Sequence, residues 1–306
     1  MSIPIYIPET LLSKEELAEW IEQLPDIIAT CAKRWDLRIE KPLTEEDAEM
    51  SYGYIAPAMR SDGQEVILKI SPLDRLENEK RVAHALQLCD GSSTVKLLDV
   101  DEETGTHLLE RIRPGVPLGT LPDDDEMTRI AARQMKRFWH PVPPEHSFRP
   151  TAYEIEGFTR LRKKHNSTTG PLPEKWVVRA ETLYDELVAT STETVVLHAD
   201  LHQWNILSAE REPWLSIDPK GYFGDPGYEV GAFLANYPDE PSDSPGRSKL
   251  DVRRIEIINE EWDIPRERII KWGIVLALIW ANWSSNTPEE YWRGDIRRAE
   301  ALDSLL

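Results

Sequence analysis

The first third of the chain alternates between short apolar runs and polar turns. The runs S-Y-G-Y-I-A-P-A-M-R (51–60) and Q-E-V-I-L-K-I (64–70) flank S-D-G, a turn signal, and predict a β-hairpin. The runs V-K-L-L-D-V-D (95–101) and T-H-L-L-E-R-I (106–112) are separated by E-E-T-G and predict a second hairpin. With a helix over 13–33, one further strand and a helix between the hairpins, the pattern indicates a five-stranded antiparallel sheet.

The pattern becomes mostly helical after R-P-G at 113–115. One stretch repeats apolar residues at 176, 180, 183 and 187, which lie on a single helical face. We therefore expect an α+β protein with a small antiparallel-sheet lobe over 1–113 and a larger, mainly helical lobe over 114–306. The apolar segment 269–283 contains Lys271 and is short for a membrane span, so it predicts a buried helix.

Polar residues with metal-binding and acid–base chemistry gather around a third predicted hairpin. N-I-L-S and P-W-L-S-I-D are two short apolar strands with a polar link, so Asn205 and Asp218 at their ends should lie side by side. An amide oxygen and a carboxylate are hard ligands suited to Mg²⁺. Asp200 precedes the hairpin and is a candidate general base beside that metal, as phosphoryl transfer requires. The alternative is a polar turn that caps a hairpin.

The sheet-rich lobe holds a candidate ion pair. Lys69 interrupts the apolar strand V-I-L-K-I, and the helix that follows carries Glu79 within its apolar stripe. A carboxylate among buried residues is costly unless it is paired, and Lys69 is the expected partner. The alternative is two unrelated surface charges.

Composition narrows the classes of partner. The net charge of −19 disfavours nucleic acid and anionic membrane surfaces, while it suits cationic small molecules or serves solubility alone. Two cysteines argue against a disulfide framework, and the N-terminus shows no signal-peptide pattern, so we expect a cytoplasmic protein. We also expect it to be a monomer. Only a short segment separates Asp218 from the next predicted helix, and no A-P-E motif is present, which disfavours a protein kinase.

Several stretches together resemble the aminoglycoside phosphotransferase family of the protein-kinase-like fold. The similar branch is that of streptomycin 6-phosphotransferases and hydroxyurea phosphotransferases. The matching stretches are S-Y-G-Y-I-A-P-A, E-V-I-L-K-I, V-K-L-L-D-V-D, L-L-E-R-I-R-P-G, F-R-P, L-H-A-D-L-H-Q-W-N-I-L and I-D-P-K-G-Y-F-G-D-P-G-Y-E-V. The resemblance implies a bilobal kinase that uses ATP and Mg²⁺ to phosphorylate a hydroxyl of a small molecule.

The resemblance also implies roles for individual residues. Asp200 would be the catalytic base, and Asn205 and Asp218 would bind Mg²⁺. The nucleotide would be bound by a set of residues from the small lobe: Lys69 at the α- and β-phosphates, Glu79 orienting it, Tyr52 and Gly53 in a loop poor in glycine, and main-chain groups around Glu110 and Ile112 at the adenine edge. Lys220 in D-P-K-G could screen phosphate charge or form a surface salt bridge.

The acceptor is predicted less sharply than the chemistry. Trp204 stands where the family commonly has a smaller or polar residue, and Ala199 where it commonly has glycine. Acidic residues concentrate around and after the catalytic stretch, which suits a cationic acceptor, although the small lobe is acidic as well. Candidate acceptor contacts are Trp204, Asp239, Glu240, Asp243, Glu260, Glu261 and Asp263.

Three functions remain open at this point. The first is a kinase that inactivates a streptomycin-like aminoglycoside and so confers antibiotic resistance. The second is a kinase for hydroxyurea or another small hydroxyl or amino-sugar compound. The third is a non-catalytic nucleotide-binding pseudokinase. The presence of Lys69, Glu79, Asp200, Asn205 and Asp218 together favours an active enzyme, because a pseudokinase does not need the base.

Overall fold

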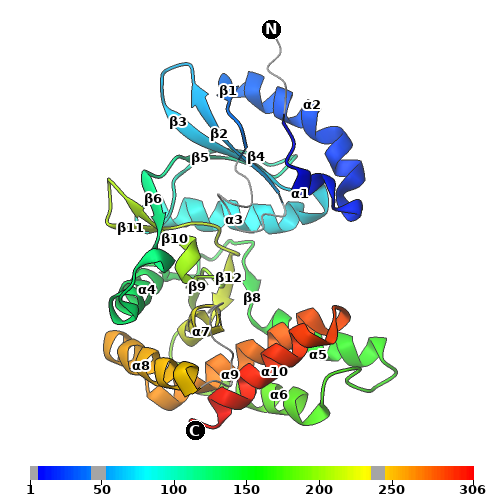
Figure 1. Ribbon diagram of the computed structural model, residues 1–306, viewed down its shortest axis with the longest axis vertical. Helices are drawn as coiled ribbons and strands as arrows, with labels where there is room; N and C mark the ends of the chain where they lie inside the picture. The colour runs from blue at the N-terminus through cyan, green and yellow to red at the C-terminus, as the bar shows by residue number, and fades with distance from the viewer. Residues whose placement is uncertain (1–5, 43–52, 236–244) are drawn as a thin grey trace. The chain divides into compact units, whose positions relative to one another are not determined.

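The computed structural model describes residues 6–42, 53–235 and 245–306 (Figure 1). The chain divides into two compact units, Met1–Arg113 and Pro114–Leu306. Each unit has its own hydrophobic core. The first carries a five-stranded sheet, and the second is built mainly of helices.

The sheet of the first unit has the strand order β1-β2-β3-β5-β4, and all its pairings are antiparallel. Both hairpins expected from the sequence are present, β2 with β3 and β4 with β5. The elements are α1 (Glu9–Leu12), α2 (Ala18–Arg34), β1 (Leu37–Ile39), β2 (Tyr54–Arg60), β3 (Glu65–Ile70), α3 (Leu76–Cys89), β4 (Leu97–Asp101) and β5 (Thr106–Glu110).

The long N-terminal helix begins later than expected. The prediction placed it over 13–33, whereas α2 starts at Ala18 and follows a 3₁₀ turn at Glu15–Leu17. Lys14 has an extended backbone conformation, with φ −90° and ψ 95°, and this interrupts the helical path after α1. The hydrophobic pattern does not reveal the break, because Leu11 and Leu17 are buried on either side of it.

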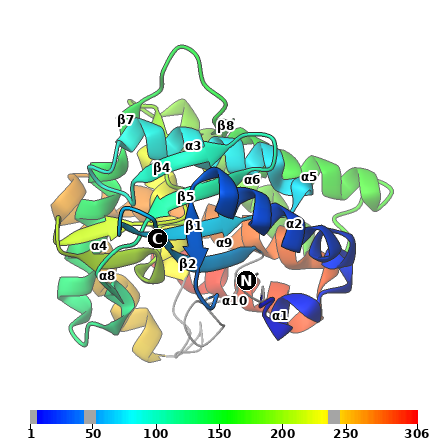
Figure 2. The ribbon, with the colours of Figure 1, turned by 90° about the horizontal axis from the view of Figure 1, so that it is seen from above.

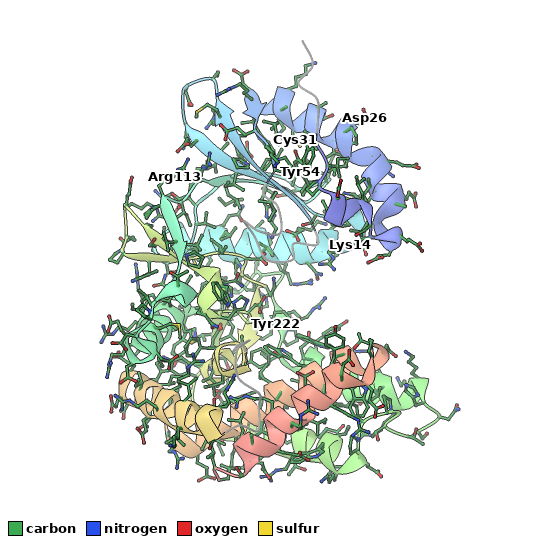
Figure 3. The ribbon with its side chains drawn as sticks, in the orientation of Figure 1. Lys14, Asp26, Cys31, Tyr54, Arg113 and Tyr222 are labelled. Carbon is green, nitrogen blue, oxygen red and sulfur yellow. The ribbon has the colours of Figure 1, made fainter. Side chains whose placement is uncertain are left out.

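Helix α2 covers one face of this sheet (Figure 2). Its buried side chains, among them Cys31, pack with inward-facing strand residues such as Tyr54, both labelled in Figure 3. Strand β3 alternates, so that Val66, Leu68 and Ile70 are fully buried in this core. Side chains alternate between the faces of a strand, so Lys69 belongs to the opposite face.

The second unit has two small sheets. One has the order β11-β10-β6, and the other has the order β7-β9-β12-β8, in which β12 and β8 are parallel. The strands are β6 (Pro114–Pro117), β7 (His140–Pro141), β8 (Arg149–Pro150), β9 (Val195–Leu197), β10 (Ile206–Ala209), β11 (Trp214–Ser216) and β12 (Tyr222–Gly224). Tyr222, at the start of β12, is labelled in Figure 3.

Helices form most of the second unit: α4 (Asp124–Phe138), α5 (Ala152–Lys164), α6 (Glu174–Ala189), α7 (Val230–Ala235), α8 (Pro245–Trp262), α9 (Arg266–Trp283) and α10 (Glu289–Asp303). Helix α9 is central, because α5, α6, α7, α8 and α10 all pack on it. It contains the apolar segment 269–283, and most of its residues are buried, as the sequence predicted. Within the residues described, none of the helices combines the length and the apolar character needed to cross a membrane.

Candidate active site

The predicted hairpin that carries Asn205 and Asp218 is present. Ile206 of β10 pairs with Ser216 of β11, and the Ile217 N–H donates to the Asn205 carbonyl over 2.9 Å. The hydrogen-bonded strands therefore end with Asn205 opposite Ile217, and Asp218 is the next residue. The sequence prediction that the two ends of this hairpin meet is confirmed.

Asp200 and Asp218 come together through Lys220. The Lys220 ammonium nitrogen lies 2.6 Å from Asp218 Oδ2 and 3.3 Å from Asp200 Oδ2. All three side chains are partly exposed. Burial raises the pKa of Asp200, while the positive charge of Lys220 opposes that rise. Of the two roles left open for Lys220, the salt bridge is observed, and it links the predicted base to a predicted metal ligand.

Asp218 adopts a left-handed backbone conformation with φ +59°. Aspartate tolerates this region better than most residues, because its short polar side chain can hydrogen-bond locally. The chain turns sharply here between β11 and β12, and Gly221 is also left-handed, with φ +64°. These two residues give the 218–221 loop its shape and direct Asp218 and Lys220 toward Asp200.

His198 holds the 198–200 turn against the 217–220 loop. It is fully buried, and its Nε2 lies 2.9 Å from the Ile217 carbonyl while its Nδ1 accepts from the Asp200 N–H. A carbonyl can only accept, so Nε2 carries the proton and the ring is neutral. Burial lowers the pKa of His198 to about 3, so the ring stays neutral near pH 7, with both of its nitrogens engaged by the backbone.

Glu229 supports the same turn from the other side, and the sequence analysis missed it. Its fully buried carboxylate accepts from the Ala199 N–H at 3.1 and 3.2 Å. Burial raises the pKa of this carboxyl to about 8, although the main-chain donors oppose the rise. The signal that identified Glu79 was present here too, because Glu229 is an acid next to the apolar run V-G-A-F-L-A.

Ala199 has φ +65°, a left-handed conformation that disfavours residues with a Cβ atom. This explains physically why glycine suits the position. We expect Ala199→Gly to stabilise the protein modestly, by about 0.5–1 kcal/mol, because relief of strain is offset by greater unfolded-state entropy. Urea unfolding measures this, with Ala131→Gly inside helix α4 as a control that should destabilise. A loss of stability in Ala199→Gly would contradict the assigned strain.

The donor set suits a magnesium ion held jointly with phosphate oxygens. The Asn205 side-chain nitrogen donates to the Asp200 carbonyl over 3.0 Å and lies 3.2 Å from His202 Nε2, so the amide oxygen remains for a cation. Asp218 adds a carboxylate. Among the described residues, no group of three or more His, Cys, Asp or Glu side chains is arranged to hold a metal. Mg²⁺ commonly binds through one or two carboxylates plus substrate phosphates, so this small set fits it.

The predicted ion pair of the first unit is also present. Lys69 Nζ lies 3.9 Å from Glu79 Oε2, and both side chains are largely buried. His107 pairs with Lys69 across β3 and β5, and its Nδ1 lies 3.6 Å from the same Glu79 oxygen. The sequence analysis did not identify His107, because a single polar residue within an apolar strand does not indicate what it contacts. It adds a third polar group on the sheet face opposite α2.

The other predicted nucleotide contacts are only partly described. Tyr52 lies outside the described residues. At Gly53 a Cβ atom would stand 2.7 Å from the Ile70 carbonyl oxygen, so glycine is required by the approach of β3. The Glu110 N–H donates to the Lys96 carbonyl over 3.0 Å, and the role of Glu110 and Ile112 at the adenine edge stays a prediction.

The predicted acceptor residues are only partly described. Asp239, Glu240 and Asp243 lie outside the described residues, and Glu260 is exposed on α8. Asp263 follows that helix and is exposed. Glu261 binds Arg133 of α4 at 2.7 and 2.9 Å, which lowers the pKa of its carboxyl. Trp204 packs on Gly119, where a Cβ atom would stand 3.0 Å from the indole. Only Trp204 belongs to the 198–218 stretch.

Comparisons with known proteins identify relatives of this chain that are named as kinases or phosphotransferases. Streptomycin 6-kinase of Streptomyces griseus is 30% identical over 282 residues, which is 90% of this chain and 89% of that protein. Hydroxyurea phosphotransferase of Kitasatospora aureofaciens is 33% identical over 220 residues, 71% of this chain and 63% of that protein. Both are named as transferring phosphate to small molecules.

Solved structures confirm the predicted protein-kinase-like fold. Choline kinase LicA from Streptococcus pneumoniae superposes with a TM-score of 0.66 at 16% identity, covering 92% of this chain and 99% of that one. An aminoglycoside phosphotransferase in ternary complex with ADP and hygromycin B has a TM-score of 0.58 at 14% identity, covering 90% and 97%. At such identities the likeness concerns the fold alone.

The match to a protein-family model assigns the family of this chain most directly. The model described as aminoglycoside/hydroxyurea antibiotic resistance kinase matches residues 44–287, which include the 198–229 network and the Lys69–Glu79 pair. The match spans most of the chain and both of its units. This chain, a small-molecule phosphotransferase, therefore belongs to the aminoglycoside/hydroxyurea antibiotic resistance kinase family.

Proposed function

We propose that this protein is an ATP- and Mg²⁺-dependent phosphotransferase that phosphorylates a hydroxyl of a streptomycin-like aminoglycoside. The observation that carries the proposal is the meeting of Asp200, Asn205 and Asp218 on two hydrogen-bonded loops. The similarity to two streptomycin 6-kinases, at 30% and 29% identity over nine-tenths of the chain, supports this acceptor class.

The residues would divide the chemistry as follows. The Asp200 carboxylate accepts the proton of the acceptor hydroxyl, whose oxygen forms a bond to the γ-phosphorus. The bond from that phosphorus to the oxygen shared with the β-phosphate breaks, and ADP leaves. Asn205 and Asp218 would hold Mg²⁺, which supplies charge neutralisation at the phosphates. Lys69, oriented by Glu79, would bind the α- and β-phosphates.

A cationic acceptor suits the charge of the chain. The net charge is −19, and negative proteins concentrate cationic ligands near their surface. Attraction between exposed charges is screened within about 10 Å at 0.1 M ionic strength. The KM for a cationic acceptor should therefore rise with salt more than the KM for ATP does.

Hydroxyurea is the second candidate acceptor. It is favoured by the 33% identity with a hydroxyurea phosphotransferase, although that match covers less of each chain. Hydroxyurea is neutral and small, so it would not depend on the net charge of the protein. The salt dependence of KM separates the two acceptors.

A screen of ADP release decides between them. Purified protein with ATP and Mg²⁺ should release ADP on addition of streptomycin, with less or no release for hydroxyurea, other aminoglycosides and simple amino sugars. Mass spectrometry of the product should show one added phosphoryl group. The Asp200→Asn variant serves as the catalytic blank. Release of ADP with hydroxyurea alone would replace the first acceptor by the second, and no release with any compound would refute the proposed function.

A further inference from the structure

Lys220 is the one lysine in the D-P-K-G segment, and its ammonium group lies between two carboxylates with proposed roles in the reaction. Its Nζ contacts Oδ2 of Asp218 at 2.6 Å and Oδ2 of Asp200 at 3.3 Å. We propose that Lys220 is an exchangeable counter-ion, which occupies Asp218 before the metal binds and then moves to the phosphoryl group in transfer. This inference rests on the proposed function, and it assigns a catalytic residue beyond the base and the metal ligands.

The main chain of Lys220 is fixed while its side chain can move. The Lys220 N–H donates to the His198 carbonyl over 2.8 Å, which ties the loop to the turn that carries Asp200. The side chain is 39% exposed, so it is not locked in the core. A lysine side chain has a flexible four-carbon stem and three donor hydrogens, so the ammonium group can change partners while the backbone stays in place.

Asp200 and Asp218 both lie beside one ammonium group, and a positive charge between them is needed to offset the repulsion of their negative charges. Without Lys220 or a metal, Asp200 and Asp218 would repel each other across the site. A cation bound to Asp218 would lie close to the Lys220 ammonium group, which contacts Oδ2, and the two positive charges would repel each other. Metal binding should therefore displace the ammonium group from Asp218, and removal of the ammonium group should favour the metal.

The transferred phosphoryl group is a suitable destination for the displaced ammonium group. The nucleotide brings phosphate oxygens with the metal, and the transferred phosphoryl must lie near Asp200, because Asp200 receives the proton of the attacking hydroxyl. Lys220 already reaches Asp200. It can therefore contact both Asp200 and the phosphoryl oxygens as negative charge redistributes over them. Lys220 stays protonated throughout, since the hydroxyl proton goes to Asp200.

A counter-ion of this kind predicts two effects of opposite sign. Lys220→Met should bind Mn²⁺ alone, without nucleotide, about two- to fivefold more tightly than the wild type, the size expected for one partly exposed ion pair. The same variant should turn over roughly a hundredfold more slowly, because the phosphoryl group loses a positive partner. A merely structural salt bridge would weaken metal binding and turnover together.

Lys271 offers a matched control. It also bridges two carboxylates, Glu186 at 2.5 Å and Glu267 at 2.6 Å, but it lies between helices α9 and α6, and both of its partners are exposed. Lys271→Met should leave Mn²⁺ affinity and turnover unchanged. Lys220→Arg keeps the positive charge, so its Mn²⁺ affinity should stay at or below that of the wild type.

The experiment is a Mn²⁺ titration followed by electron paramagnetic resonance, together with steady-state kinetics, after circular dichroism has established folding. Unchanged or weaker Mn²⁺ binding in Lys220→Met would overturn the proposal that Lys220 is an exchangeable counter-ion. If that variant does not fold, Mn²⁺ binding in Lys220→Arg that equals or falls below that of the wild type supports the competition, and tighter binding overturns it. Tighter binding with turnover within threefold of the wild type would overturn the contact with the phosphoryl group. Absence of acceptor turnover in the wild type would refute the proposed function instead, while the Mn²⁺ titration would still decide the competition for Asp218.

Discussion

Asp200→Asn is expected to lower turnover by roughly 10²- to 10⁴-fold, the range for a positioned general base. The asparagine side chain has nearly the same shape and can still accept from Lys220, but it cannot take the proton of the acceptor hydroxyl. Nucleotide binding and the unfolding midpoint should stay close to those of the wild type. The measurement is the steady-state rate of ADP release with saturating acceptor, together with ATP affinity by calorimetry.

The matched control is Asp36→Asn, which makes the same chemical change at an exposed residue after α2. Asp36 has φ +53°, and asparagine tolerates that conformation, so the fold should not suffer. Its turnover should equal that of the wild type. Asp200→Asn with turnover within a few-fold of the wild type would remove Asp200 from the role of base.

Glu229 is expected to make stability depend on pH between about 4.5 and about 8. Burial raises the pKa of this carboxyl from 4.5 to about 8, so within that window the folded protein holds a proton that the unfolded chain releases. The contribution to stability is complete below pH 4.5, falls as pH rises and is lost above pH 8. Its size is on the order of 4 kcal/mol.

Glu229→Gln removes this titration while it keeps an oxygen for the Ala199 N–H. As pH rises from 5 to 8, the free energy of unfolding of the wild type should therefore fall relative to that of the variant. His198 titrates in the opposite sense below pH 6.5, but it is present in both proteins and cancels in the difference. Urea unfolding at several pH values measures it, with Glu260→Gln as an exposed control. A difference independent of pH would show that Glu229 is ionised in the folded protein.

Much of the fold could be predicted because the strands of the three hairpins have clear apolar patterns and turn signals. The same patterning identified Lys69 and Glu79, since a charge inside an apolar stripe has to find a partner. Strands β7 and β8 could not be predicted, because each has two residues, one of them proline. Such strands exist through their long-range pairing with β9 and β12 and carry no periodic signal of their own.

The sequence predicted the proposed base and metal ligands, but it predicted less of the contacts that hold them in position. Asp200, Asn205 and Asp218 could be predicted because their residue types and their spacing along one hairpin indicate a base and two metal ligands. The contacts of Glu229 with Ala199 and of Lys220 with Asp200 depend on how loops far apart in sequence are folded together. Spacing alone does not define those contacts, because they result from tertiary hydrogen bonds that close around the fully buried His198.

The hydrogen bonds of the 198–200 turn join it both to the 217–220 loop and to Glu229, and this connected network has an evolutionary consequence. Each of the three segments is bonded to another, so a mutation in one is felt by the others and selection must act on them together. Residues outside the network, such as Glu260 on α8, make none of these hydrogen bonds, so we expect their substitution to leave the network in place. The same fold is found in a choline kinase and in an aminoglycoside phosphotransferase bound to hygromycin B, so the fold alone does not set the acceptor.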